Sequence, residues 1–181
     1  MTLQGNQIYL RLLELSDADG NYPNWLNDPD VCRYNSHGEA LYTREMAKAY
    51  ITSISNNPSI QVFAICEIQN NQHIGNISLQ QISAKNRSAE FAILIGEPSV
   101  YGKGIGYEAG KLVLNHAFNT LKLHRIYCGT HSENIAMQHL ALALGMEQEG
   151  IRRDAIFKNG QFTDIIEYGL LNINQVYYQE I

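Results

Sequence analysis

Three alternating glycines at the junction of two apolar segments constrain this chain more than any other feature. Gly102, Gly104 and Gly106 follow residues 89–95, which are apolar and β-branched, and open a segment with helical periodicity. Because these positions lack β-carbons, backbone N–H groups can converge on one point where the helix starts. Such a helix start binds anions such as a pyrophosphate, and Lys103 adds charge beside it. The sequence therefore predicts a strand, a phosphate-binding loop and a helix in succession.

Two well-known phosphate loops do not fit this spacing. The dinucleotide pattern G-x-G-x-x-G requires glycine at position 107, where the chain has Tyr107. A Walker loop ending at Lys111 requires glycine at 105 and Ser or Thr at 112, where the chain has Ile105 and Leu112. The loop therefore belongs to another class of anion site.

The remaining pattern predicts a mixed α/β chain. Thr43 and either Ser132 or Asn134 are helix N-cap candidates, as is the pair Ser16-Asp17. Because several strands precede the alternating part, we expect a mixed sheet with helices on both sides rather than a purely parallel fold. Gly145 is expected to end a helix in the left-handed conformation, and Asn159-Gly160 to form a type I′ turn. The expected strands are 8–13, 61–68, 73–82, 89–95, 124–128, 147–157 and 161–171, and the expected helices are 16–25, 43–54, 104–120 and 134–144.

Composition narrows the class of protein further. The 181 residues are 45% hydrophobic and 17% charged, which predicts one globular domain spanning 1–181. The net charge of −5 disfavours nucleic acid as a partner, although residues 102–125 carry four basic residues and one acid. The start of the chain does not resemble a signal peptide, and no apolar run is long enough for a membrane helix. The widely spaced Cys32, Cys66 and Cys128 indicate reduced thiols and a cytoplasmic location.

The glycine loop resembles the signature of the GCN5-related N-acetyltransferases, Q/R-x-x-G-x-G/A. Residues 101–106, Tyr-Gly-Lys-Gly-Ile-Gly, match it except that Tyr101 replaces Gln or Arg. Residues 25–31, 133–134 with 144–146, and 149–153 also resemble the branch with ribosomal-protein alanine and amino-sugar acetyltransferases. The resemblance implies a twisted, mostly antiparallel mixed sheet of about seven strands, flanked by about four helices and splayed at its central strands.

The resemblance also implies acetyl-CoA as co-substrate, without a metal. The pantetheine arm of acetyl-CoA is expected along the strand before the loop. There one amide among Ile93, Leu94 and Ile95, with Leu94 preferred, would stabilise the oxyanion. Asn134 matches a family residue whose side-chain amide contacts the cofactor. The expected cofactor-binding residues are Ile93, Leu94, Ile95, Tyr101, Gly102, Lys103, Gly104, Ile105, Gly106 and Asn134.

Proton transfer is less clearly assigned. A protonated amine cannot attack a thioester, so a group must accept its proton directly or through water. The family's usual acids, a Tyr or a Ser on the penultimate helix, are replaced by Ala141 and Met137. Glu90 is the candidate base. His131 is a second catalytic candidate, for which an ordinary strand-end histidine is the alternative interpretation, and positioning alone is a third route. The substrate-side candidates are Trp25, Tyr34, Asn35 and His37.

Two functions from different classes follow from these residues. The first is an N-acetyltransferase in which a primary amine, from an amino sugar or a protein N-terminus, attacks acetyl-CoA directly in a ternary complex, as a monomer or homodimer. The alternative is an acetyl-CoA sensor or partner-docking module with little turnover, which the absent tyrosine at position 141 would explain.

Overall fold

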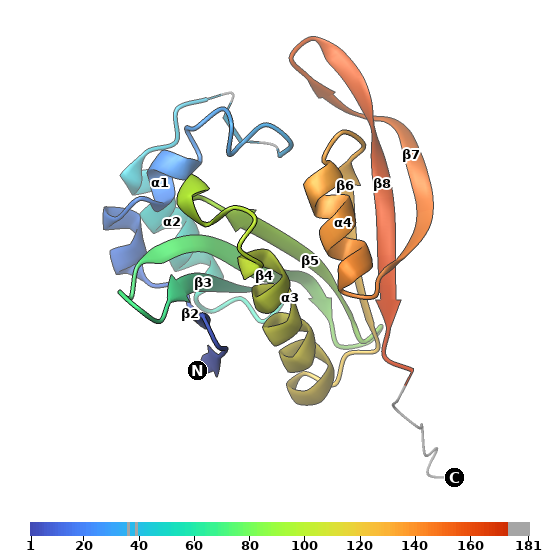
Figure 1. Cartoon of the computed structure of the whole chain (residues 1–181), viewed down its shortest axis with the longest axis horizontal. Coiled ribbons are helices and arrows are strands. Elements are labelled where there is room, and N and C mark those ends of the chain that lie inside the picture. The colour runs from blue at the N-terminus through green and yellow to red at the C-terminus, as the bar shows by residue number, and fades with distance from the viewer. Residues whose placement is uncertain (36, 39, 174–181) are drawn as a thin grey trace.

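One twisted sheet organises the described part of the chain. The structure is a computed structural model that describes residues 1–35, 37–38 and 40–173. Its sheet has the strand order β1-β2-β3-β4-β5-β6-β8-β7 (Figure 1). The strands are β1 (Thr2–Gln4), β2 (Ile8–Leu12), β3 (Gln61–Glu67), β4 (His73–Ser83), β5 (Ser88–Ile95), β6 (Arg125–His131), β7 (Glu147–Lys158) and β8 (Gln161–Leu171).

The centre of the sheet is where the two halves separate. Strands β5 and β6 are parallel and pair only over Ser88–Glu90 and Arg125–Tyr127. Every other neighbouring pair is antiparallel. Beyond Glu90 and Tyr127 the two strands continue without pairing to each other, β5 still on β4 and β6 still on β8. The predicted mixed, mostly antiparallel sheet with central strands that splay apart is confirmed.

Helices cover both faces of this sheet. They are η1 (Leu15–Asp19), α1 (Tyr22–Trp25), α2 (Arg44–Ile54), η2 (Pro98–Val100), α3 (Ile105–Asn115), η3 (His116–Thr120) and α4 (Ile135–Ala143). Successive residues of β3 point to opposite faces, so Phe63 and Ile65 join a core with α3, whereas Val62 and Ala64 join one with α1 and α2. Figure 1 shows α3 and α4 on the viewer's side of the sheet.

The N-terminal region differs from the prediction. The sheet has eight strands rather than about seven, because the three-residue β1 pairs with β2 at the edge. The predicted helix 16–25 is divided into η1 and α1, and its N-cap is Glu14 rather than Ser16 or Asp17. Asp17 accepts a hydrogen bond from the Glu14 backbone N–H at 2.7 Å, which holds this first turn.

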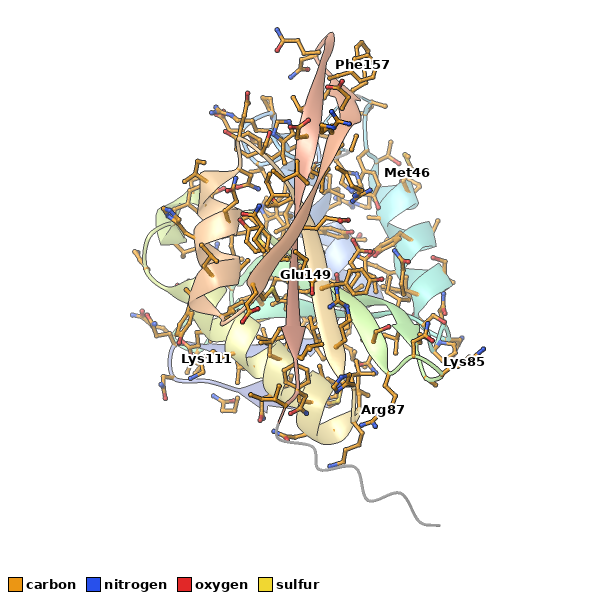
Figure 2. All side chains as sticks on the ribbon, turned by 90° about the vertical axis from the view of Figure 1, so that its right-hand side faces the viewer. Met46, Lys85, Arg87, Lys111, Glu149 and Phe157 are labelled. Carbon is orange, nitrogen blue, oxygen red and sulfur yellow. The ribbon has the colours of Figure 1, made fainter. Side chains whose placement is uncertain are left out.

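Several local predictions are confirmed. Thr43 and Asn134 cap α2 and α4 by accepting from the backbone N–H three residues on. Gly145 has φ 85°, and Asn159 and Gly160 have φ 52° and 79°, as a type I′ turn requires. The hairpin β7–β8 carries that turn beyond the rest of the sheet, and Figure 2 shows its end at Phe157. Within the described residues no helix is both long and apolar enough to cross a bilayer.

Candidate active site

The glycine loop connects the splayed strand to α3. Gly102 and Gly104 have φ 74° and 79°, a region that favours glycine, and Gly104 is the N-cap of α3. Because Gly104 has no side chain, the first amides of α3 receive no side-chain cap. A β-carbon built on Gly102 or Gly104 meets no protein atom within 4 Å. The loop therefore presents backbone donors to open space, as an anion cradle requires.

Tyr101 takes the first position of the loop, where the family pattern has Gln or Arg. Its hydroxyl donates a hydrogen bond to the Ile95 carbonyl at 3.1 Å, while the residue stays 53% exposed. Partial burial raises the pKa of its phenol, and the carboxylates of Asp28, Asp30 and Glu97 raise it further. Tyr101 is therefore a neutral donor that braces the loop against the end of β5.

The direction of the backbone N–H groups along β5 identifies the amides that face the splay between β5 and β6. The Gly96 N–H donates to the Ile74 carbonyl on β4 at 2.9 Å. Backbone groups of alternate residues point to opposite edges of a strand, so the Leu94 amide also points towards β4. The amides of Ile93 and Ile95 point towards the splay. The prediction that the Leu94 amide faces the thioester is corrected to these two neighbours.

Glu90 lies at the last paired position before the splay, opposite Tyr127. It is half-buried, and its Oε2 accepts a hydrogen bond from Gln81 Nε2 at 2.6 Å. Gln81 reaches it from an irregularity in β4, where Gln81 itself has φ 49°. Burial raises the pKa of the Tyr127 phenol, and the charge of Glu90 raises it further. The carboxylate is thus held where β5 and β6 part, on the face opposite α3.

Helix α4 supplies no proton donor at the family's two positions. The methyl group of Ala141 and the thioether of Met137 have no acidic hydrogen, and both side chains pack into the main core. Asn134 is confirmed as the N-cap, since its Oδ1 accepts from the Met137 N–H at 3.1 Å. Its amide nitrogen is the part of the side chain that would contact a cofactor.

His131 ends β6 beneath the loop between α1 and α2. It is only 5% exposed, so it is not the solvated strand-end histidine of the simpler interpretation. Its Nδ1 accepts from the Glu133 N–H at 3.2 Å, and Nε2 lies 2.8 Å from Thr163 Oγ1. In the neutral ring Nε2 therefore carries the hydrogen and donates it to Thr163. With both nitrogens engaged, His131 is better placed to organise its neighbours than to take a proton from an amine.

The four substrate-side candidates fall into two groups. Trp25 is 4% exposed and its indole Nε1 donates to Glu97 Oε1 at 3.0 Å, so the prediction that it contacts the acceptor is corrected: it is a core residue. Tyr34, Asn35 and His37 lie together in the α1–α2 loop. The Tyr34 ring packs 5.3 Å from that of His131, between ring centroids, which places this loop over the end of β6.

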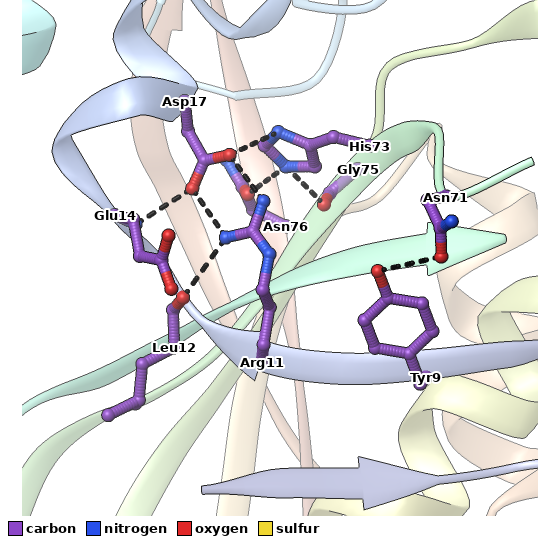
Figure 3. A network of polar contacts seen from close by, with 9 residues as sticks. All are labelled: Tyr9, Arg11, Leu12, Glu14, Asp17, Asn71, His73, Gly75 and Asn76. Atoms are coloured by element: carbon purple, nitrogen blue, oxygen red, sulfur yellow. Dashed lines mark hydrogen bonds and ion pairs between the residues drawn. The ribbon is translucent and has the colours of Figure 1, made fainter. Parts of the chain in front are cut away.

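A buried polar network ties η1 to the strands next to the site (Figure 3). Arg11 donates to both carboxylate oxygens of Asp17 at 2.8 and 2.6 Å, and His73 Nδ1 lies 3.4 Å from the same group. His73 Nε2 bonds Asn76 Oδ1 at 2.8 Å. Burial alone would raise the pKa of Asp17, but hydrogen bonds from Arg11 and His73 hold it well below its usual range. Through Asn76, the network supports β4 at the position that pairs with Leu94 on β5.

Within the described residues no group of three or more His, Cys, Asp or Glu side chains is placed to hold a metal ion. The three cysteines are free and buried, and burial raises the pKa of the Cys128 thiol to about 12, with a further contribution from Glu90.

Comparison with known proteins shows which protein family this chain belongs to. The family model described as an acetyltransferase (GNAT) domain matches residues 7–147. The chain belongs to the GNAT acetyltransferase family. It is accordingly an N-acetyltransferase, an enzyme that uses acetyl-CoA as co-substrate, and the predicted family is confirmed. The open cradle on α3 and the splay beside it fit that co-substrate.

Relatives extend the similarity over almost the whole chain. A probable N-acetyltransferase of Bacillus subtilis is 31% identical over 175 residues, covering 94% of this chain and 97% of its own length. A spermidine N(1)-acetyltransferase of Vibrio cholerae is 31% identical, covering 88% of this chain and 90% of its own length. The crystal structure of spermidine N-acetyltransferase from Vibrio cholerae in complex with CoA and spermine superposes with a TM-score of 0.84. That match has 27% identity and covers 92% of this chain and 96% of the other.

Proposed function

We propose that this GNAT enzyme acetylates a primary amine of a small polycation by direct attack in a ternary complex. The observation that carries the proposal is the opening between β5 and β6 beyond Glu90, next to glycines whose missing β-carbons leave open space. The pyrophosphate of acetyl-CoA binds the N-terminus of α3. The pantetheine arm then runs along β5, and the thioester reaches the splay. Residues 1–181 act together as one domain.

The open edge of β5 supplies the oxyanion donor. The amide of Ile93 or Ile95 donates to the thioester carbonyl as negative charge develops there. Leu94 contributes its side chain, which packs towards α1 and α2. Lys103 and the first amides of α3, at Ile105 and Gly106, hold the phosphates. Asn134 adds its side-chain amide from the start of α4.

Glu90 accepts the proton of the attacking amine, directly or through one water molecule. Its place at the start of the splay supports this role, as does its orientation by Gln81. The thiolate leaves without a dedicated acid, since Ala141 and Met137 cannot supply one. Positioning of the two substrates then provides a large part of the rate.

Two observations favour a polyamine over the amino sugar or protein N-terminus expected from sequence. Relatives named spermidine N-acetyltransferases are 29–31% identical and cover 88–89% of the chain. The carboxylates of Asp28 and Glu97 are close enough to raise the pKa of Tyr101, as is that of Asp30, which also pairs with Arg33. Such a group of negative charges attracts a molecule with several ammonium groups.

A panel of amines tests this proposal. CoA release from acetyl-CoA is measured with spermidine, with an amino sugar and with a peptide that starts with alanine, each over a range of concentrations. The proposal expects the highest kcat/KM with spermidine. A higher value with either of the other two moves the acceptor to that class. Binding of acetyl-CoA in calorimetry without CoA release for any amine would instead support the sensor or docking function.

A further inference from the structure

The ammonium of Lys158 joins two distant parts of the chain. This residue ends β7, next to the hairpin turn. Its Nζ donates to the backbone carbonyls of Cys32 and Asn35 at 2.6 Å each and of His37 at 3.1 Å. An ammonium has three hydrogens to donate, so all of them are used on one loop. Hydrogen bonds from a charged donor are about twice as strong as neutral ones.

Two further contacts support the loop that carries these three carbonyls. Cys32 is 1% exposed, and its Sγ donates to the Trp25 carbonyl at 3.2 Å, which fixes this part of the loop to the core. The His37 N–H donates to Asn35 Oδ1 at 2.8 Å, which turns the chain back on itself. The Lys158 ammonium in turn contributes to lowering the pKa of His37, after burial. The three carbonyls and the Lys158 ammonium therefore form one compact polar unit.

This unit attaches the α1–α2 loop to the β7–β8 hairpin. The loop carries Tyr34, which packs on His131 at the end of β6, and His131 in turn bonds Thr163 on β8. The loop is thus held at two places, by Lys158 on the hairpin and by Tyr34 on the sheet. Strand β6 forms one side of the splay, and the loop lies against the end of that strand through Tyr34.

We propose that Lys158 is a positioning residue for the acceptor amine. Its ammonium fixes the α1–α2 loop against the hairpin, and the loop then forms one wall of the acceptor path. Removing the ammonium releases that wall without touching the glycine loop that holds acetyl-CoA. The affinity for the amine therefore falls while the affinity for acetyl-CoA is kept. This inference rests on the proposed function for its kinetic part only.

The test compares Lys158→Met with Lys158→Arg and with the control Lys85→Met. Methionine keeps the unbranched chain of lysine without its terminal ammonium and has no donor, whereas arginine restores donors. Lys85 is exposed in the β4–β5 turn, far from the hairpin tip in Figure 2. With spermidine as the acceptor, Lys158→Met is expected to raise the amine KM about tenfold. Its kcat and its KM for acetyl-CoA stay within about twofold of the unmodified enzyme, a change below 0.5 kcal/mol. Lys158→Arg recovers part of the loss.

Limited trypsin digestion gives a readout that does not depend on the acceptor. Arg33 lies in the same loop with an exposed side chain, so release of the loop exposes the bond after it. Cleavage there is expected to be about tenfold faster in Lys158→Met and unchanged in Lys85→Met. Unchanged cleavage overturns the attachment, and faster cleavage with an unchanged amine KM overturns the positioning role. If spermidine is not acetylated at all, the proposed acceptor fails, and digestion together with the KM for the amine that is accepted decides this inference.

Discussion

Gly96 lies against the indole of Trp25 so closely that a β-carbon on Gly96 would stand 2.0 Å from Cδ2 of the ring. The Trp25 indole also donates to Glu97, the residue after Gly96. Its ring centroid lies 4.9 Å from that of His73. The end of β5 is therefore fixed to α1 immediately before the glycine loop begins. The cofactor loop has a rigid support on its N-terminal side.

Gly96→Ala is expected to lower the free energy of unfolding by about 1–3 kcal/mol, because the new methyl group overpacks the core. Chemical denaturation followed by the fluorescence of Trp25, the single tryptophan, measures it. Gly150→Ala is the matched control, since a β-carbon there meets only Glu167 Oε2, at 3.7 Å. Equal stability of the two variants would contradict the close contact.

His116 is expected to make stability depend on pH near neutrality. It is 2% exposed, its Nε2 bonds Gln61, and its Nδ1 is buried without a partner in the described residues. Burial lowers the pKa of His116 from 6.5, so below that pH the unfolded chain binds a proton that the folded chain does not. The stability that the neutral, buried His116 contributes is fully present above pH 6.5 and is lost as the pH falls below that value.

Urea denaturation at pH 7.5 and pH 5.5 checks this expectation. His116→Gln should reduce the pH dependence of the unfolding free energy, by up to about 1.4 kcal/mol per pH unit. His139→Gln, at an exposed position of α4, is the control and should leave the dependence unchanged. An unaltered slope in His116→Gln would show that other groups cause the pH dependence.

Features set by short-range chemistry could be predicted from the sequence. The positive φ values at Gly104, Gly145 and Gly160 follow from glycine or an Asn-Gly pair at a turn. The caps at Thr43 and Asn134 follow from side chains that accept from nearby amides. These features locate the cofactor loop and the ends of the helices that the caps and glycines mark.

Features that depend on pairing between distant residues could not be predicted in this way. The sequence favours the amide of Leu94 as the one that faces the splay, but a one-residue difference in register reverses the direction of every backbone group. The pair Ser16-Asp17 predicts a helix cap, yet the carboxylate of Asp17 is held by Arg11 on β2 as well as by its own turn. The contact from Lys158 to Cys32 spans 126 residues, and no local pattern indicates it.

Glu90→Gln is expected to lower turnover about a hundredfold while acetyl-CoA affinity in calorimetry stays nearly unchanged. The amide keeps the shape and an accepting oxygen but cannot take a proton at neutral pH. Activity should partly return at higher pH, where more of the amine is already deprotonated. Glu45→Gln, at an exposed position in the first turn of α2, is the control. Wild-type turnover across the pH range would remove Glu90 from the mechanism.

Calorimetric titration of acetyl-CoA into Gly104→Leu and Gly160→Leu tests the cofactor site most directly. Both glycines have φ 79° and open space around the missing β-carbon, so leucine costs a similar strain at each, about 1–2 kcal/mol. Gly104 is at the start of α3, whereas Gly160 is in the hairpin turn. The account predicts that folded Gly104→Leu loses acetyl-CoA affinity by at least about a hundredfold while Gly160→Leu binds as the unmodified chain does. Equal affinity in the two folded variants would contradict binding of the pyrophosphate at the N-terminus of α3.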